Sequence, residues 1–196
     1  MFEDELISRT SMQSDTQQIA LGLRQGDLAV LEALVEQYQY RLVRYLIYLL
    51  GRRDGVDDLV QETWLRVLER GSSYDGHSRF EPWLFRVARN IALDAMRKRQ
   101  NLSLDSDDDD GRLPPSPASM EPSPFTLASR TEDADRLAHS LQTLDPVHRE
   151  ALVLRFQEDL SLQEISAIVG APVSTVASRI YRGLATLRPQ FEGETA

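Results

Sequence analysis

Hydroxyl and guanidinium side chains gather on one face of a helix predicted near the carboxyl end of the chain. At about 100° per residue, the apolar side chains of this helix form a single stripe. The stripe contains Val176, Ile180, Leu184 and Leu187. The opposite face carries Thr175, Ser178, Arg179, Arg182 and Thr186, with no acidic residue among them. Such groups bind phosphate oxygens and base edges, so this face has the chemistry of a DNA contact surface.

The residues before this helix predict the turn that positions it. Ser161 and Glu164 have the spacing of a capping box, which predicts a first helix that ends at Gly170. Ser174 is then expected to cap the second helix, which runs to about Leu187. Two helices joined in this way match a helix-turn-helix, whose second helix enters the major groove of DNA. The alternative is an ordinary helical hairpin whose arginines are only solvated.

Composition limits the remaining classes of function. The chain has 196 residues and no cysteine, which excludes disulfides and cysteine-based zinc sites. It contains no apolar run long enough to span a membrane and no export signal, so no membrane insertion and a cytoplasmic location are expected. We find no metal-ligand spacing, phosphate-binding glycine loop or nucleophile motif. The sequence therefore predicts no catalytic residue, no metal and no cofactor.

Three helices are predicted in the first part of the chain. The first begins at Asp15 or Thr16, and the second begins after Asp27 and ends at Gly51. The third opens at Asp54, Asp57 or Asp58 and closes at Gly71. Its apolar residues, which include Val67 and Leu68, are expected to point inward. The polar residues Asp58, Gln61 and Glu62 are expected to point outward.

A basic face is predicted on the next helix, over residues 80–99. At helical pitch, one arc of about 100° carries Arg79, Arg86, Arg89, Asn90 and Arg97, opposite the apolar side. The polar loop before this helix contains Tyr74 and His77, which could stack on exposed bases. A solvated charged face is the alternative for the helix taken alone.

The negative charge of the chain is concentrated between its two helical parts. The net charge is −9, and residues 101–135 contain nine acidic and two basic side chains. That stretch has proline and serine in place of an apolar period, as is typical of a linker. We therefore predict an all-α protein with two small helical domains joined by a flexible acidic linker. The expected boundaries are 1–14 for a flexible terminus, 15–100 for the first domain, 101–131 for the linker and 132–190 for the second domain.

Two long motifs resemble one known family. The segments DDLVQETWLRVL and FEPWLFRVARNIALDAMRKR resemble region 2 of sigma-70 family initiation factors, and LDPVHREALVLRFQEDLSLQEISAIVGAPVSTVASRIYRGLATLR resembles their region 4. With only a linker where region 3 would lie, the chain resembles an extracytoplasmic-function (group IV) sigma factor. The resemblance implies binding to core RNA polymerase, through its beta-prime clamp helices and beta flap, and to promoter DNA. It also implies an anti-sigma factor as a partner.

The resemblance also implies roles for individual residues. The polymerase-binding surface would contain Asp57, Asp58, Gln61 and Glu62. The downstream (minus 10) element would be bound by Tyr74, Asp75, His77, Arg86, Asn90 and Arg97. The upstream (minus 35) element would be bound by Arg155, Ser174, Thr175, Ser178, Arg179 and Arg182. Ala177 departs from the family, because many relatives have lysine or arginine there.

Three further interpretations stay open at this point. Asp107 to Asp110 either mimic RNA charge in the polymerase exit path or belong to a solvated tether. The whole chain could instead be a two-domain regulator with a helix-turn-helix output, which would bind duplex DNA without polymerase. A nucleic-acid enzyme would need a carboxylate or histidine cluster, which we do not find in the sequence.

Overall fold

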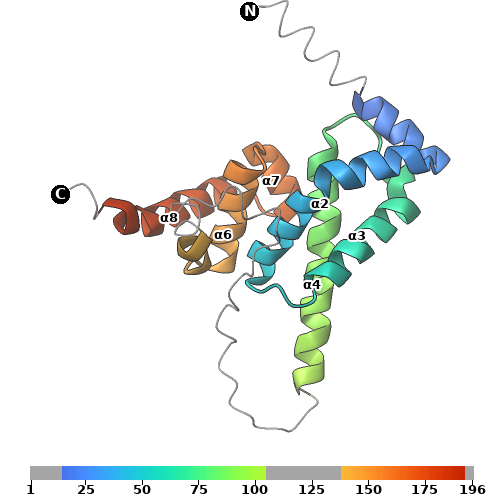
Figure 1. Cartoon of the computed structure of the whole chain (residues 1–196). Coiled ribbons are helices and arrows are strands. Elements are labelled where there is room, and N and C mark those ends of the chain that lie inside the picture. Colours follow the sequence, from blue (N-terminus) through green and yellow to red (C-terminus); the bar gives the residue numbers. More distant parts are fainter. Residues whose placement is uncertain (1–14, 105–137, 193–196) are drawn as a thin grey trace, which may run out of the picture.

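The protein is described by a computed structural model that covers residues 15–104 and 138–192, and within these ranges it contains helices and loops but no strand. The all-α prediction is therefore confirmed. Two groups of helices lie side by side, with the long helix α4 (Phe80–Leu104) in the first group and α8 (Val173–Glu192) in the second (Figure 1). The proposed terminus 1–14 and the acidic run Asp107 to Asp110 lie outside the described residues.

The N-terminal unit starts with two helices whose ends follow the sequence signals. One covers residues 15–25, and α2 (Leu28–Leu50) follows it. The Asp27 side chain accepts a hydrogen bond of 2.9 Å from the backbone N–H of Ala29, so it caps α2 as predicted. The helix ends at Gly51, whose φ of 68° is left-handed.

Helix α3 (Val56–Arg70) begins differently from the prediction. Its N-cap residue is Gly55, with φ of 76° and no side-chain cap hydrogen bond, so none of the three candidate aspartates caps it. Asp57 and Asp58 instead lie in the first turn, where a negative charge is favoured by the helix dipole. A short 3₁₀ turn, η1 (Gly71–Ser73), then leads into the loop before α4.

An aromatic cluster fixes the loop between η1 and α4. The Tyr74 ring is buried against Phe80 and Trp83, with centroid distances of 5.4 and 5.7 Å. Its hydroxyl donates a hydrogen bond of 2.5 Å to the backbone carbonyl of Ser78. On the other side of the loop, the Thr16 hydroxyl donates to the carbonyl of Gly76 over 2.9 Å. The loop is therefore attached both to its own helix and to the first helix of the chain.

A substitution at Gly76 tests how tightly the loop packs against the first helix. It has φ of 73°, and a Cβ there would lie 2.9 Å from Ala20 Cβ and 3.0 Å from the Thr16 carbonyl oxygen. We expect Gly76→Ala to lower the free energy of unfolding in urea by about 1–3 kcal/mol. Gly26→Ala is the matched control, because Gly26 has φ of 67° but no atom within 4 Å of the added carbon. Equal losses in the two variants would contradict this packing.

The C-terminal unit contains the predicted helix-turn-helix. A helix over residues 138–142 is followed by α6 (Pro146–Leu152), a π-helical turn η2 (Val153–Gln157) and α7 (Leu162–Val169). Both hydrogen bonds of the capping box between Ser161 and Glu164 are present, and Gly170 ends α7 with φ of 66°. The sequence signals at both ends of α7 are thus confirmed. Asp145 precedes α6 as predicted, although its side chain makes no cap hydrogen bond.

Helix α8 differs from its prediction at both ends. The carbonyl of Pro172 accepts hydrogen bonds from the N–H groups of Thr175 and Val176, so the helix begins at Val173. Ser174 consequently lies inside the first turn and is not the cap residue. The helix continues to Glu192, beyond the predicted end at Leu187.

The two units share one continuous apolar core. Helices α6 and α7 lie against α2 and α4 (Figure 1), and a single cluster of buried residues extends across the boundary. From the N-terminal unit this cluster includes Leu46, Phe85 and Ala92, and from the C-terminal unit it includes Leu144 and Leu154. The sequence predicted two separate domains with a tether between them. The structure places them in one closed arrangement.

Candidate nucleic-acid and polymerase interfaces

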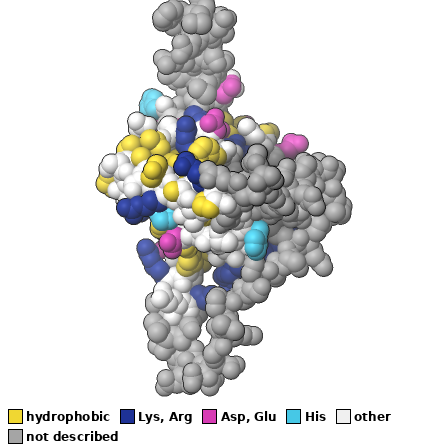
Figure 2. All heavy atoms as spheres, turned by 90° about the vertical axis from the view of Figure 1, so that its left-hand side faces the viewer, with side chains coloured by type: hydrophobic (Ala, Val, Ile, Leu, Met, Phe, Trp, Pro, Cys, Tyr) yellow, Lys and Arg dark blue, Asp and Glu magenta, His cyan; other side chains and the backbone are white. Residues whose placement is uncertain are grey.

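The predicted DNA-reading face of α8 is partly exposed to solvent. Ser174 and Arg182 are exposed, and Thr175, Ser178 and Arg179 are half-buried. In Figure 2, which views the molecule from the side of the C-terminal unit, basic side chains lie among hydrophobic ones and acidic side chains are few among the described residues. The structure therefore brings together the five α8 residues predicted to read DNA.

Close packing against α6 sets the orientation of α8. Val176, Ile180 and Leu187 are buried, as their spacing predicted. A Cβ on Gly183 would lie 2.9 Å from Leu152 Cδ1, so the two helices approach closely at this point. Leu184 differs from its prediction, since it is 42% exposed. The buried apolar stripe is therefore narrower than expected.

Arg155 lies apart from the face of α8. It belongs to the π-helical turn η2, and its Nη1 donates a hydrogen bond of 2.9 Å to the carbonyl of Leu160. The guanidinium thereby braces the loop that leads into α7. A phosphate contact by Arg155 stays a prediction.

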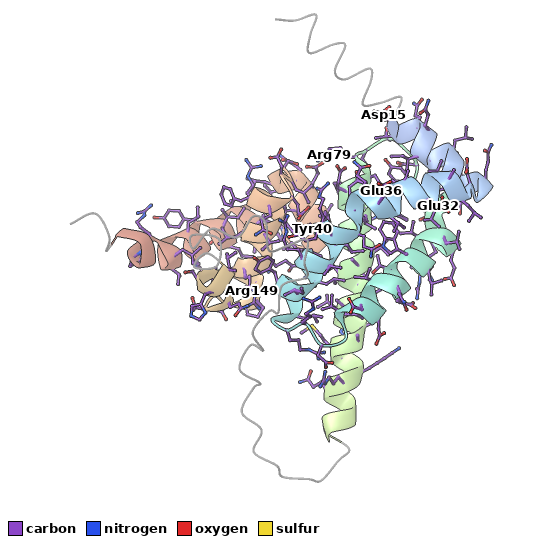
Figure 3. All side chains as sticks on the ribbon, in the orientation of Figure 1. Asp15, Glu32, Glu36, Tyr40, Arg79 and Arg149 are labelled. Atoms are coloured by element: carbon purple, nitrogen blue, oxygen red, sulfur yellow. The ribbon has the colours of Figure 1, made fainter. Side chains whose placement is uncertain are left out.

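The basic arc on α4 is divided by the closed arrangement. Arg86, Asn90 and Arg97 are exposed, and Arg97 forms an ion pair of 3.0 Å with Asp94 on its own helix. Arg79 and Arg89 instead form contacts with the C-terminal unit. In Figure 3, Arg79 lies where α4 begins, beside the C-terminal unit. Only part of the predicted arc is therefore accessible in this arrangement.

The structure of the loop before α4 corrects the prediction for one residue of the minus 10 surface. Tyr74 is only 1% exposed, so its ring cannot stack on a base in this structure. Burial raises the pKa of its hydroxyl to about 12, and it remains a hydrogen-bond donor. Asp75 and His77 are exposed, and the Asp75 carboxylate accepts a hydrogen bond of 2.9 Å from the His77 backbone N–H. The aromatic residue organises the loop, whereas the exposed polar residues can face a ligand.

The outer face of α3 presents the predicted polymerase-binding residues. Asp57, Asp58 and Gln61 are exposed, while Glu62 forms an ion pair of 2.7 Å with Arg66. Sequence reasoning missed two leucines on the same side of the helix. Leu65 and Leu68 are 55% and 46% exposed, although Leu68 was expected to point inward. The i, i+4 spacing from Gln61 to Leu65 is the signal that could have placed the first of them.

Comparison with known proteins gives the family. The family profile "Sigma-70 region 2" matches residues 34–102, and "Sigma-70, region 4" matches residues 134–187. Sigma factor CarQ of Myxococcus xanthus is 32% identical over 165 residues, which cover 84% of this chain and 91% of CarQ. The extracytoplasmic-function sigma factor SigM of Bacillus subtilis is 30% identical, with 82% and 94% covered. The chain belongs to the sigma-70 family, in its extracytoplasmic-function group.

Other relatives of this sigma factor differ in length. SigE of Mycolicibacterium smegmatis is 34% identical over 167 residues, and the aligned part covers 83% of this chain but only 63% of SigE. Among solved structures, sigma factor RpoE in complex with anti-sigma factor NepR from Bartonella quintana has a TM-score of 0.70 and 26% identity, and the match covers 83% of this chain and 97% of that one. CnrH, solved with the cytosolic domain of CnrY, has a TM-score of 0.63 at 24% identity over 91% of this chain and 98% of that one, which supports the fold.

The sigma factor thus carries its predicted sites on both family regions. Helix α3 lies within region 2 and α4 mainly within it, while α7 lies within region 4 and α8 mainly within it. Within the described residues, no helix is long and apolar enough to cross a membrane. In the same residues, acidic and histidine side chains form no group of three that could hold a metal ion. Because the chain belongs to the sigma-70 family, we discard the alternative interpretation of it as a two-domain regulator.

Proposed function

We propose that this sigma factor binds core RNA polymerase, recognises minus 35 and minus 10 promoter elements and promotes DNA melting. One observation carries the proposal. Two helical units in the order of regions 2 and 4 each expose arginines on a single helix face, and an exposed acidic helix start lies beside the first of these faces. The two DNA-binding domains are proposed to span residues 15–100 and 132–190, with a linker at 101–131 whose first four residues continue helix α4 to Leu104.

The acidic start of α3 is proposed as the polymerase-docking surface. Asp57, Asp58, Gln61 and Glu62 would contact the beta-prime clamp helices, and the beta flap would contact region 4. The exposed Leu65 adds apolar area beside these polar groups. An apolar patch with charged residues around it is the usual composition of a specific protein interface.

The exposed part of α4 and the preceding loop are proposed to bind the minus 10 element. Asp75 and His77 would face a base flipped out of the duplex, and Arg86, Asn90 and Arg97 would hold the neighbouring strand. Capture of an unstacked base offsets the few kcal/mol needed to open the duplex, so melting requires no nucleotide hydrolysis. This sigma factor is accordingly proposed to be a binding protein and not an enzyme, acting in the cytoplasm with the polymerase and without a cofactor.

The open face of α8 is proposed to read the minus 35 element. Arg179 and Arg182 supply the guanidinium groups of this face. A bidentate contact from a guanidinium to a base contributes about 1–3 kcal/mol of discrimination against the wrong base. We expect Arg179→Ala or Arg182→Ala to weaken binding of the holoenzyme to promoter DNA by about tenfold or more. Affinity for core polymerase is expected to remain unchanged. On a template whose upstream element has been replaced, the variants and the unaltered protein should bind equally, and a persisting difference would contradict the assignment.

An anti-sigma factor is the remaining proposed partner. The relative RpoE was solved in complex with the anti-sigma factor NepR, and that protein is 26% identical to this chain and matches its fold with a TM-score of 0.70. We extend the class of partner, and not the individual protein, to this sigma factor. Such a partner would cover the surfaces proposed to bind polymerase.

One experiment tests the proposed function as a whole. The purified protein is mixed with core polymerase and a library of promoter sequences, and open complexes are scored by permanganate reactivity of unpaired thymines. Melted DNA near the start site, dependent on the added protein, is expected. A known sigma factor in the same assay serves as the positive control. If the control opens DNA and this protein does not, the proposal is wrong.

A further inference from the structure

The minus 10 loop, residues 74–79, carries its two proposed base-facing residues on either side of a buried glycine. Asp75 and His77 are exposed, whereas Gly76 between them is buried. The Asp75 carboxylate accepts a hydrogen bond of 2.9 Å from the backbone N–H of His77, which fixes these two residues relative to each other. Their position relative to the rest of the sigma factor therefore depends on what holds Gly76.

The first helix of the chain, residues 15–25, holds Gly76 through a buried hydrogen bond. The Thr16 side chain is buried, and its hydroxyl donates a hydrogen bond of 2.9 Å to the Gly76 carbonyl, which lies 60 positions away in the sequence. Loss of this donor would be costly, because the carbonyl would stay buried and unpaired. Thr16 thus fixes the middle of the loop from beneath its surface.

Packing attaches the same helix to the chain at two points. A Cβ on Gly76 would lie 2.9 Å from Ala20 Cβ, and a Cβ on Gly71 would lie 2.9 Å from Leu23 Cβ. Ala20 and Leu23 are three positions apart, so they share one face of the first helix, and both belong to the apolar cluster that contains Tyr74. In Figure 1 the green loop before α4 passes beside the blue first helix. The first helix therefore contacts both the start of η1 and the centre of the minus 10 loop.

Contacts with α4 hold the two ends of the loop. The Tyr74 ring packs on Phe80 and Trp83, and its hydroxyl donates a hydrogen bond to the Ser78 carbonyl. These contacts fix residues on both sides of the base-facing pair. The centre of the loop is fixed by the first helix instead, so the direction in which the pair points depends on both attachments.

The attachment of Gly76 comes from outside the range that matches the family profile. The region 2 profile begins at residue 34, after the end of the first helix. Asp75 and His77 lie inside the matched range, whereas Thr16 and Ala20 lie before it. The matched part of region 2 thus contains the residues proposed to face the base but not the helix that holds Gly76.

We propose that the first helix, through Thr16 and Ala20, positions the minus 10 loop and thereby sets its base specificity. Thr16 is a positioning residue, because its hydroxyl is buried and acts on DNA only through Gly76. Discrimination between bases needs hydrogen bonds of correct length and direction, and a shift of about 0.5 Å or 10–20° is enough to weaken them. The inference rests on the proposed function, in which Asp75 and His77 face a flipped base.

Base preference is measured with holoenzyme formed from the full chain and core polymerase. Four templates differ only at the base proposed to be flipped, and open complexes are scored by permanganate reactivity of a thymine that all four share. The unaltered protein is expected to prefer one base. Thr16→Val removes the donor at nearly constant volume, and it should lower the ratio of the preferred to the disfavoured base by about fivefold or more. Loss of folded protein would reduce open complexes equally on all four templates, so this ratio reports positioning and not stability.

Thr16→Ser and Thr63→Val are the matched variants. Thr16→Ser retains the hydroxyl and should keep the ratio within about twofold of the unaltered protein. Thr63→Val makes the same substitution at another buried hydroxyl, which donates a hydrogen bond of 2.7 Å to the Leu59 carbonyl within α3, and it should leave the ratio unchanged. An unchanged ratio in Thr16→Val would overturn the inference, as would an equal loss in Thr16→Ser or Thr63→Val.

If Thr16→Val proves unfolded by circular dichroism, Ala20→Gly provides a second test. It removes the methyl group that packs on Gly76 but no hydrogen-bonding group, and the ratio is expected to fall by about twofold or more. An unchanged ratio in this variant, or equal opening of all four templates by the unaltered protein, would overturn the inference while leaving the proposed function intact. A complete lack of open complexes with the unaltered protein, while a known sigma factor opens its own promoter, would overturn both.

Discussion

Asp58→Arg is expected to lower the affinity of the sigma factor for core RNA polymerase by about 100-fold or more. Asp58 is exposed in the first turn of α3, beside Asp57 and Gln61. Reversal of its charge places a cation against a surface that would bind an anion, and a like-charge contact within an interface costs several kcal/mol. The arginine also lies at the positive end of the helix, where it opposes the helix dipole. The affinity is measured by titration of labelled core polymerase.

The control for this prediction has to change the net charge by the same amount. Glu36→Arg does so at an exposed position of α2, and it is expected to leave polymerase binding within about twofold. Urea unfolding of both variants verifies that the fold is retained. If Glu36→Arg weakens binding as much as Asp58→Arg, the effect is one of long-range charge and α3 is not the docking surface.

The exposed leucines of α3 support a docking role for this helix. Leu65 is 55% exposed and Leu68 is 46% exposed, and both lie on the outer side of the N-terminal unit. Exposed apolar side chains next to charged ones are a common feature of protein interfaces, whereas scattered single leucines are not. The acids would then orient the encounter, and the leucines would contribute buried apolar area. The charge reversal at Asp58 therefore tests both how the acids orient the sigma factor on core polymerase and how tightly the two proteins bind.

The start of α2 and both ends of α7 could be predicted because their signals are local. Asp27 caps α2, Ser161 and Glu164 form the capping box of α7, and Gly170 ends that helix, each within four residues of its partner. Helical periodicity likewise placed Val176 and Ile180 in the core. At the start of α8 the prediction of Ser174 as the cap residue was wrong, although serine is common at that position of a helix. In the structure, the carbonyl of Pro172 accepts the first hydrogen bonds of the helix.

The boundary between the two units could not be predicted, because its partners are distant in the sequence. Glu158 and Arg41 are separated by 117 positions, and Glu150 and Arg89 by 61. A single acid on an amphipathic helix predicts only a solvated position, and no periodicity indicates which arginine it will find. Tyr74 illustrates the same limit, because only the folded loop shows that its ring packs on Phe80. Local patterns thus predicted the surfaces, and non-local contacts decided which of them are accessible.

Arg86→Ala is expected to reduce open complexes on fully paired promoter DNA by about 10- to 100-fold. Arg86 is exposed on the part of the basic arc that the C-terminal unit leaves free. A hydrogen bond from a guanidinium to a strand oxygen contributes about 1.5–3 kcal/mol, and this contribution is proposed to hold the opened strand. Binding to core polymerase should be unchanged, because the side chain lies on α4 and the docking surface lies on α3. Open complexes are counted by permanganate footprinting.

A template that is already unpaired around the minus 10 element separates melting from other defects. Because no duplex has to be opened there, Arg86→Ala is expected to recover initiation to within about threefold of the unaltered protein, since the proposed contacts of Asp75 and His77 with the flipped base are retained. Arg24→Ala serves as the control, because it removes an exposed arginine outside the arc and should be neutral on both templates. A defect of equal size on paired and unpaired DNA would mean that Arg86 acts after melting. In that case the strand-holding role would move to Asn90 and Arg97, the remaining exposed members of the arc.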